Sequence, residues 1–467
     1  MRFVALAAII MCFPAFVAWL RARPHHRPIA LTLIAASYFT VGLIQIEASL
    51  ITWPMWSGPV RGIQLSMIDA LGLALIVTRR QKPGAIPYKW VFWAYLIAIA
   101  LSIIPSVVHM ASAFSAYQFA RIFLTYIAVA PELMTPLGVM GLIRGFAIGL
   151  TIQGGSVLLQ KGQGVVQAGG TGFHQNTLGI MVELTLIPIV AAILAGERSK
   201  LLKLGAVAGL VVVAGGGSRA TMGYAVSGLA VLLVLSLVQR STPVKWRVLG
   251  VGLLAAVLIA PLAIKTMSAR FGSNTMLQED DQRIAMAKAA RAMATDHPFG
   301  VGANMYTTTG NTGGYSERAG VSWGGNTRGA PVHNSYLLAR AETGWHGELA
   351  FILWLIVPII AGLRFAFKAR DSIFGSLSLG SAVAIAVMAL HVNVEFAAHT
   401  YGVQNLITLN FALIAGAYMT QRLRQRAGRR PPPSDADTRA GALPRPPGRS
   451  DGGLDDLRGP RRTVRPA

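Results

Sequence analysis

The residues best suited to chemistry gather around one histidine. His333 ends a long polar stretch, and Asn334 and a hydrophobic run follow it directly. A histidine at such a water boundary titrates near neutral pH and can take a proton from a hydroxyl nucleophile. Asn334 is a favourable helix N-cap, so we expect a helix to begin just after the histidine. A purely structural role at the helix start is the alternative for His333.

Three arginines offer binding groups for an anion. Arg219 follows Ser218 and three glycines at the end of an apolar run, where a planar guanidinium fits phosphate oxygens. Arg283 and Arg291 lie about two helical turns apart in an alanine-rich stretch and can flank one anion. The alternatives are an Arg219 side chain that extends to lipid headgroups, and surface ion pairs for the other two arginines.

Two further polar positions stand at the edges of apolar runs. The glycine-rich segment 169–172 leads to His174 and Asn176, which can bind a sugar or a phosphate at a helix start. A tight turn with Asn176 as the N-cap explains the same residues. Glu342 lies where the polar stretch re-enters apolar sequence, and we expect this carboxylate to pair with polar groups rather than to act as a catalyst.

The sequence shows no set of residues with metal-ligand spacing. Its single cysteine, Cys12, lies in the first apolar run, which excludes an internal disulfide and a cysteine metal cluster. We therefore expect chemistry that is independent of a metal, and we predict no other cofactor.

Composition places these residues in a membrane protein. Hydrophobic residues make up 53% of the 467 residues and charged residues only 13%, which indicates an all-α, polytopic helical bundle. With about 20 apolar residues needed per crossing, we expect about 12–13 transmembrane helices within residues 1–420. The expected spans are 3–20, 28–47, 63–78, 89–108, 113–131, 135–158, 174–195, 201–217, 219–238, 247–266, 346–364, 373–391 and 402–420.

One large polar loop, residues 267–345, interrupts the spans. We expect a helix from Glu279 to just before Pro298, because acids open that stretch and bases follow them. The glycine- and threonine-rich segment 307–330 is predicted to be flexible, either as a lid over a substrate or as a plain linker.

Lysines and arginines set the expected orientation. The short basic loops all fall on one side of the predicted spans, so that side is expected to be the cytoplasm. The large loop and the other polar clusters are then expected to face the outside.

The tail, residues 421–467, holds 12 arginines against 5 aspartates and many prolines. We expect it to be disordered in the cytoplasm, near membrane lipids. Because no aromatic residues interleave its bases, nucleic-acid binding is not predicted despite a net charge of +23.

Three sets of motifs together resemble the O-antigen ligase and O-antigen polymerase superfamily of bacterial envelope glycosyltransferases. The first two are Gly-Phe-His-Gln-Asn-Thr-Leu-Gly at 172–179 and Ser-Arg-Ala at 218–220. The third is Pro-Phe-Gly-Val-Gly at 298–302, followed by His-Asn-Ser-Tyr-Leu at 333–337 and Glu-Thr-Gly at 342–344. The resemblance extends over residues 160–420, and the earlier spans are similar only in hydropathy.

The resemblance implies an inverting glycosyltransferase that works without metal or nucleotide. Such an enzyme moves a glycan from a polyprenyl diphosphate carrier to an acceptor hydroxyl, which belongs to another glycan or to a lipid A core. His333 matches the family's catalytic histidine, and Arg219 and Arg283 match its diphosphate-contacting arginines. Polymerase and ligase both stay open, and segment 307–330 has no counterpart from which an acceptor could be inferred.

A multi-span transporter or flippase is the competing class. A transporter is expected to show an internal repeat or paired interrupted helices, with ionisable groups near the bilayer midplane. The sequence shows no repeat, and its strongest polar cluster lies in one loop outside the spans. These features favour the enzyme.

Overall fold

A computed structural model describes residues 2–40, 43, 47–80, 83–271 and 275–428. The chain divides into two compact units, Met1–Gln421 and Arg422–Ala467. Residues 421–428, expected to belong to a disordered tail, form the last turns of the helix Tyr401–Gly428. Beyond Gly428 the tail lies outside the described residues, and so does the disorder expected there.

The described part of the chain is mainly helical, as predicted. Its α-helices are α1 Arg2–Ala22, α2 Arg27–Ser37, α3 Met67–Val77, α4 Lys89–Leu101, α5 His109–Val129, α6 Pro136–Gly162, α7 Gln175–Leu194, α8 Lys200–Gly215, α9 Arg219–Gln239, α10 Pro243–Phe271, α11 Thr275–Asp296, α12 Tyr306–Thr312, α13 Tyr315–Arg318, α14 Ser335–Lys368, α15 Ile373–His391 and α16 Tyr401–Gly428. Three 3₁₀ turns (η1 Pro24–His26, η2 Ala130–Met134 and η3 Ala397–His399) and two strands (β1 Glu47–Thr52 and β2 Gly62–Ser66) complete the described elements.

Seven of the described helices are long and apolar enough to cross a membrane: those at Phe3–Ala22, His109–Met134, Pro136–Gly162, Gln175–Leu194, Arg219–Gln239, Ser335–Lys368 and Ile373–His391. Two other expected spans are shorter apolar helices, α3 and α4. The expected span 28–47 is also shorter, because α2 ends at Ser37.

A short β-hairpin stands where the sequence predicts none. Strands β1 and β2 pair antiparallel, with Glu47 opposite Ser66 and Thr52 opposite Gly62. Ser66 then caps α3, because its side chain accepts a hydrogen bond from the Asp69 backbone while the Asp69 carboxylate accepts one from the Ser66 backbone. This capping box begins the helix at Met67, so the predicted span 63–78 is wrong at its start.

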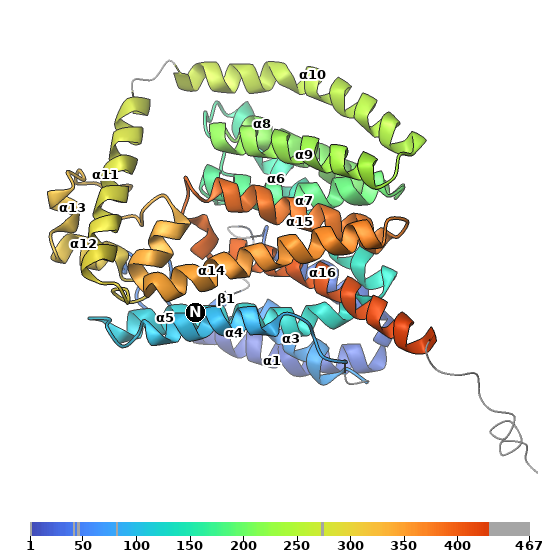
Figure 1. The fold of residues 1–467 in the computed structure, drawn as a ribbon, viewed down its shortest axis with the longest axis horizontal. Coiled ribbons are helices and arrows are strands. Elements are labelled where there is room, and N and C mark those ends of the chain that lie inside the picture. The colour runs from blue at the N-terminus through green and yellow to red at the C-terminus, as the bar shows by residue number, and fades with distance from the viewer. Residues whose placement is uncertain (1, 41–42, 44–46, 81–82, 272–274, 429–467) are drawn as a thin grey trace, which may run out of the picture. The chain divides into compact units, whose positions relative to one another are not determined.

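The long helices lie beside one another, and α11, α12 and α13 stand at one end of this bundle (Figure 1). The bundle core is aromatic. Trp354 of α14 is fully buried and lies 5.5–6.2 Å, between ring centroids, from rings of α4, α5 and its own helix: Phe92, Tyr95, Phe119 and Phe351. Such ring pairs add about 0.5–1.5 kcal/mol each beyond the burial of their area, and here they connect three helices.

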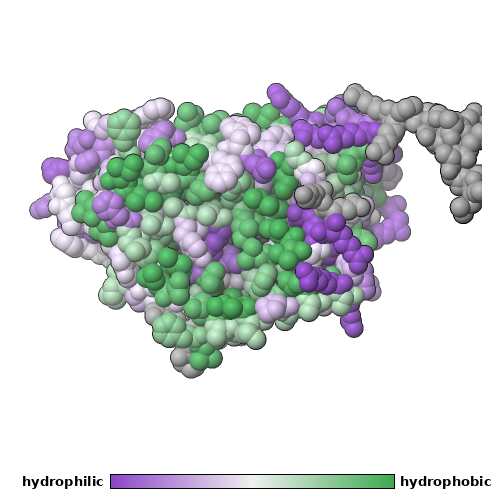
Figure 2. Space-filling model, turned by 90° about the horizontal axis from the view of Figure 1, so that it is seen from below, coloured by the Kyte–Doolittle hydropathy of each residue, from purple (hydrophilic) through white to green (hydrophobic). Residues whose placement is uncertain are grey.

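The surface suits a bilayer. Figure 2 shows one face of the protein with a mostly hydrophobic middle and hydrophilic groups gathered at both ends. Large apolar side chains on this protein are widely exposed, for example Trp93 and Ile97 of α4 at 52% and 53%. In water such surface would be costly, whereas lipid chains accommodate it.

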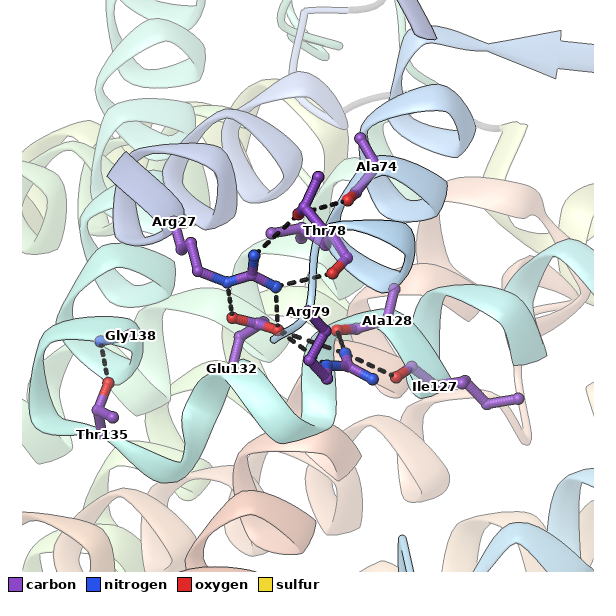
Figure 3. Close-up of polar contacts among 10 residues, drawn as sticks. Arg27, Ala74, Thr78, Arg79, Ile127, Ala128, Glu132, Thr135 and Gly138 are labelled. Carbon is purple, nitrogen blue, oxygen red and sulfur yellow. Dashed lines mark hydrogen bonds and ion pairs between the residues drawn. The ribbon is translucent and has the colours of Figure 1, made fainter. Parts of the chain in front are cut away.

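A carboxylate, Glu132, binds two arginines, Arg27 and Arg79, from loops that we expect to be cytoplasmic (Figure 3). Glu132 of η2 accepts from Arg27 at 2.6 and 2.7 Å, and from Arg79 at 3.3 and 3.4 Å. Arg27 also donates to the hydroxyl of Thr78 and the carbonyl of Leu75 at the end of α3. These contacts hold the ends of α2, α3 and η2 together and bring two of the basic loops to the same end.

The large loop is more ordered than the sequence suggests. The predicted helix is present as α11, which ends at Asp296 before Pro298. Segment 307–330, predicted to be flexible, includes α13 and all of α12 except its first residue. Buried Tyr306 and Tyr315 pack these short helices into the same core cluster as Met286 and Met293 of α11, so apolar contacts fix a segment that by composition is polar.

Candidate functional site

Three residues singled out in the sequence meet on one carboxylate. Glu395, in the turn after α15, has a side chain that is only 5% exposed. Its Oε2 lies 3.2 Å from Nδ1 of His333, and its Oε1 accepts from Nη2 of Arg283 at 3.0 Å. The amide of Asn176 on α7 also donates to Oε1. Helices α7 and α11, the start of α14 and the turn after α15 therefore contribute to one site.

The start of α14 is fixed to the turn that presents Glu395. Asn334 caps α14 as predicted, since its side-chain oxygen accepts from the Leu337 backbone at 2.9 Å. Its amide nitrogen donates to the carbonyl of Asn393 at 2.8 Å. The hydroxyl of Ser335 donates to the carbonyl of Glu395 at 2.8 Å. These bonds set the position of His333 relative to Glu395, and they leave Asn334 a positioning role.

A kink in α14 joins two of the sequence motifs. Gly344 has φ +72°, and helical hydrogen bonding is interrupted there. Two carbonyls just before the kink, those of Ala341 and Glu342, accept instead from Val301 at 3.0 Å and Gly302 at 2.9 Å. The Pro-Phe-Gly-Val-Gly and Glu-Thr-Gly motifs thus pair through their backbones. This pairing supports the short first segment of α14 that follows His333.

Glu342 lies away from Glu395. Its Oε1 accepts from the backbone nitrogen of Tyr306 at 3.0 Å, and the residue is buried. It lines a small cavity of about 30 Å³ with Gln118, His399 and Gln404. As expected, this carboxylate pairs with a polar group. Within the described residues, no hydrogen bond joins Glu342 to His333.

Arg219 lies next to the turn of α11 that carries Arg283. Ser218 caps α9 by accepting from the Thr221 backbone at 3.3 Å, which places Arg219 in the first helical turn. Nη2 of Arg219 is 3.8 Å from Oδ1 of Asp280, three positions before Arg283. The Arg219 and Arg283 side chains are 40% and 32% exposed, so both can reach an anion that approaches from solvent.

Arg291 and His174 behave differently from Arg283 and Asn176. Arg291 is exposed on α11, about 12 Å along the axis from Arg283. In the described residues no hydrogen bond or ion pair joins its side chain to Glu395. The N-cap of α7 is His174, whose Nδ1 accepts from the Asn176 backbone at 3.4 Å. The alternative explanation, a tight turn with Asn176 as the N-cap, is therefore wrong, because the buried Asn176 side chain donates to Glu395 instead.

The charges at Glu395 favour its ionised form. Burial raises the pKa of this carboxyl, but the hydrogen bond to His333 and the charge of Arg283 outweigh burial and hold the pKa below its usual value. An ionised Glu395 accepts the proton on Nδ1 of His333, so Nε2 is the basic nitrogen of the ring. The ring also packs edge-on against Phe396 at 5.5 Å, which limits its rotation.

Glu395 is the residue that reasoning from the sequence missed. It lies within the polar segment 391–401 between two apolar runs, and it belongs to none of the motifs that carry the family resemblance. The available signal was an acid, Glu395, in a short polar turn that begins at His391 and lies on the side of the membrane where the site is expected.

Among known proteins, residues 184–352 match the family model described as O-Antigen ligase. The matched region includes Arg219, Arg283 and His333, and it stops before Glu395. No curated protein matches the chain.

Proposed function

We propose that this chain transfers a polyprenyl-diphosphate-linked glycan to an acceptor hydroxyl at the periplasmic face of the inner membrane, because residues 184–352 match the O-antigen ligase family model. The family match supports a membrane glycosyltransferase of the O-antigen ligase or polymerase type. The observation that carries the finer proposal is the meeting of His333, Arg283 and Glu395 in one partly open site.

His333 is the general base of the proposed reaction. Glu395 holds the proton on Nδ1, and Nε2 removes the proton of the acceptor hydroxyl as its oxygen attacks the anomeric carbon. The carboxylate then stabilises the imidazolium that forms. The His333 side chain is 16% exposed, so an acceptor can reach it from solvent.

The arginines act on the leaving group. As the bond between the anomeric carbon and the diphosphate oxygen breaks, its electron pair stays on the diphosphate, and guanidinium groups stabilise the added charge. Arg283 already binds Glu395 and the carbonyl of Val394, whereas among the described side chains the one ion pair of Arg219 is the 3.8 Å contact with Asp280. Arg219 is therefore the freer of the two cations. Attack opposite the leaving group inverts the anomeric carbon, and no step of this scheme requires a metal.

We place the basic loops and the tail, residues 421–467, in the cytoplasm, and the large loop in the periplasm. The positions of lysine and arginine support this orientation. Labelling of single introduced cysteines in a Cys12→Ala background, by a reagent that cannot cross the membrane, tests it. A cysteine at Thr309 should react from outside intact spheroplasts, and one at Asp371 should react only after lysis.

The function itself is tested with purified protein in proteoliposomes. Wild type and His333→Ala are given the polyprenyl-diphosphate-linked repeat unit of the native host, first alone and then with its lipid A core. Ladders from the donor alone mean polymerase, and product only with the core means ligase; either is expected to vanish in His333→Ala. A fully active His333→Ala protein overturns the proposal, as does a native donor set that gives no product with folded wild type, which would favour a transporter.

A further inference from the structure

An exposed tryptophan, Trp323, lies on a closed turn within the large loop, residues 267–345. The chain leaves the local core at Val321 and returns to it at Val332, and both residues are buried. Between them, Trp323 is 80% exposed. An indole exposed to this degree gains nothing from burial in the fold, so packing does not explain it.

The loop is tied across its base. The hydroxyl of Thr327 donates to the carbonyl of Ser322 at 2.7 Å, and the Gly329 nitrogen donates to the carbonyl of Gly324 at 3.1 Å. Trp323 therefore projects from a closed turn rather than from a loose chain.

Arg328 orients the indole. Its guanidinium carbon lies 4.1 Å from the centre of the Trp323 ring. The same guanidinium donates through Nε to the carbonyl of Val321 at 2.9 Å, and the Arg328 carbonyl accepts from Asn311 at 2.9 Å. A cation fixed over one face of the ring restricts its rotation and leaves the rest of the ring to a partner.

Both ends of this loop are attached beside the candidate site. The Ser322 nitrogen donates to Oε1 of Gln282 at 2.8 Å, and Gln282 precedes Arg283 on α11. At the other end, Val332 precedes His333. The loop is thus connected at one end to the helical turn that contacts Glu395, and at the other to the proposed base.

The surroundings of Trp323 favour a carbohydrate over a lipid surface. From 322 to 329 the other residues are serine, glycine, asparagine, threonine and arginine, and none adds apolar area. Membrane-surface segments need a broader apolar face than one indole. A pyranose ring presents a flat C–H face bordered by hydroxyls, which matches an indole beside guanidinium, amide and hydroxyl groups.

We infer that Trp323 and Arg328 form a stacking subsite for a hexopyranose ring of the glycan that reacts at His333. This inference rests on the proposed function. The ring belongs to the acceptor glycan or to the donor glycan, and the indole supplies contact area while Arg328 and Asn326 supply donors and acceptors for hydroxyl groups. The subsite holds the sugar near the site without contacting the reacting atoms.

Binding is measured apart from transfer. The probe is the oligosaccharide that mild acid releases from the host's surface polysaccharide, which has no lipid or diphosphate, and binding is followed by saturation-transfer NMR with protein in nanodiscs. We expect the probe to bind wild type and His333→Ala equally. Trp323→Ala should weaken binding roughly tenfold, and Trp323→Tyr should restore most of it. The control is Trp246→Ala, a variant of another exposed tryptophan at the start of α10 (58% exposed), which should bind as wild type.

Kinetics then assign the ring to its source. A rise in the acceptor KM in Trp323→Ala with unchanged kcat assigns it to the acceptor, and a rise in the donor KM assigns it to the donor. Equal probe binding by wild type and a folded Trp323→Ala protein overturns the subsite, even if transfer depends on His333. Loss of transfer in every protein, with Trp323-dependent probe binding intact, overturns the proposed function alone.

Fluorescence quenching tests whether Trp323 contacts lipid instead of a sugar. The fluorescence difference between wild type and Trp323→Phe isolates this indole, and nanodiscs with brominated acyl chains report its depth. We expect no quenching by the brominated lipid and reduced acrylamide quenching when the oligosaccharide is bound. Strong quenching by brominated lipid would make Trp323 a membrane-interface residue and overturn the inference.

Discussion

The Nδ1 atom of His333 lies 3.2 Å from Oε2 of Glu395, although the two residues are 62 positions apart in the chain. The helical hairpin of α14 and α15 makes this possible, because the chain returns after α15 to the end at which α14 begins. Hydrogen bonds from Asn334 and Ser335 to the turn at 393–395 then hold the two ends together. The proposed base is therefore aligned by the fold and not by its neighbours in sequence.

Replacing the Glu395 carboxylate should impair transfer while leaving the fold intact. Glu395→Gln keeps the shape of the side chain but removes the charge that stabilises an imidazolium, so we expect kcat to fall by about 10²–10⁴-fold. Rates in proteoliposomes measure the effect. The matched control is Glu348→Gln, which removes a part-exposed carboxylate paired with Arg340 and should stay within about threefold of wild type. Equal rates for both variants would remove Glu395 from the mechanism.

Acid should destabilise the wild type more than Glu395→Gln. Because the folded-state pKa of Glu395 lies below its ordinary value of about 4.3, its ionised form stabilises the fold above that pH. That stabilisation is lost as the pH falls through the lower, folded-state pKa. Thermal unfolding temperatures between about pH 7 and pH 3 should therefore fall more steeply in the wild type below about pH 4.5. Parallel curves for the two proteins would contradict a depressed pKa.

The two arginines should affect the donor differently. Arg219→Ala and Arg283→Ala are each expected to lower kcat/KM for the donor by about 10²-fold. Arg283→Ala should also lower kcat at saturating donor, because it removes a partner of Glu395. Lys288→Ala removes an exposed cation from the same helix, α11, and serves as the control, with near wild-type kinetics expected. Donor titrations at fixed acceptor measure these values, and an unchanged donor response in Arg219→Ala would exclude a contact with the diphosphate.

The kink at Gly344 should not tolerate a side chain. A Cβ there would lie 2.6 Å from the carbonyl oxygen of Pro298, and φ is +72°, a region that glycine favours. Gly344→Ala should cost about 1–3 kcal/mol of unfolding free energy and reduce transfer by displacing the start of α14. Gly223→Ala, where a Cβ meets nothing within 4 Å inside α9, should be neutral or stabilising by up to about 1 kcal/mol. Thermal stability and transfer assays of both variants compare the two, and a stable, fully active Gly344→Ala protein would contradict the role of the kink.

The arginine cluster at Glu132 should contribute far more stability than an exposed ion pair. Glu132→Ala leaves Arg27 and Arg79 without their partly buried partner and should destabilise the protein by about 3 kcal/mol. Asp371→Ala removes the partner of Arg240 in an ion pair whose side chains are 60% and 75% exposed, and it should cost less than about 1 kcal/mol. Thermal unfolding in detergent ranks the two variants, and a similar loss in both would show that the cluster is not structural.

The sequence by itself determined the class of protein, the starts of its principal helices and the family motifs. Hydropathy is a sum over neighbouring residues, and the cap at Asn334 acts within one helical turn, so both can be predicted from local sequence. His333, Arg219 and Arg283 could likewise be selected from their types and from the motifs around them. The hairpin at 47–66 could not be predicted in this way. The capping box that follows it, Ser66 and Asp69, lies within a run whose hydropathy indicates one continuous apolar span.

Only the tertiary structure decided which of these residues meet. Asn176 and Glu395 are 219 positions apart, and their contact depends on how α7 packs against α15 and where the turn after α15 lies. The same packing leaves Arg291 exposed on α11. It also lets the carbonyls of Ala341 and Glu342, next to Gly344, accept hydrogen bonds from the motif at 298–302. Local patterns do not encode distances between helices. Glu395 could therefore be identified as the central carboxylate only from the packed helical bundle, in which it contacts His333, Arg283 and Asn176.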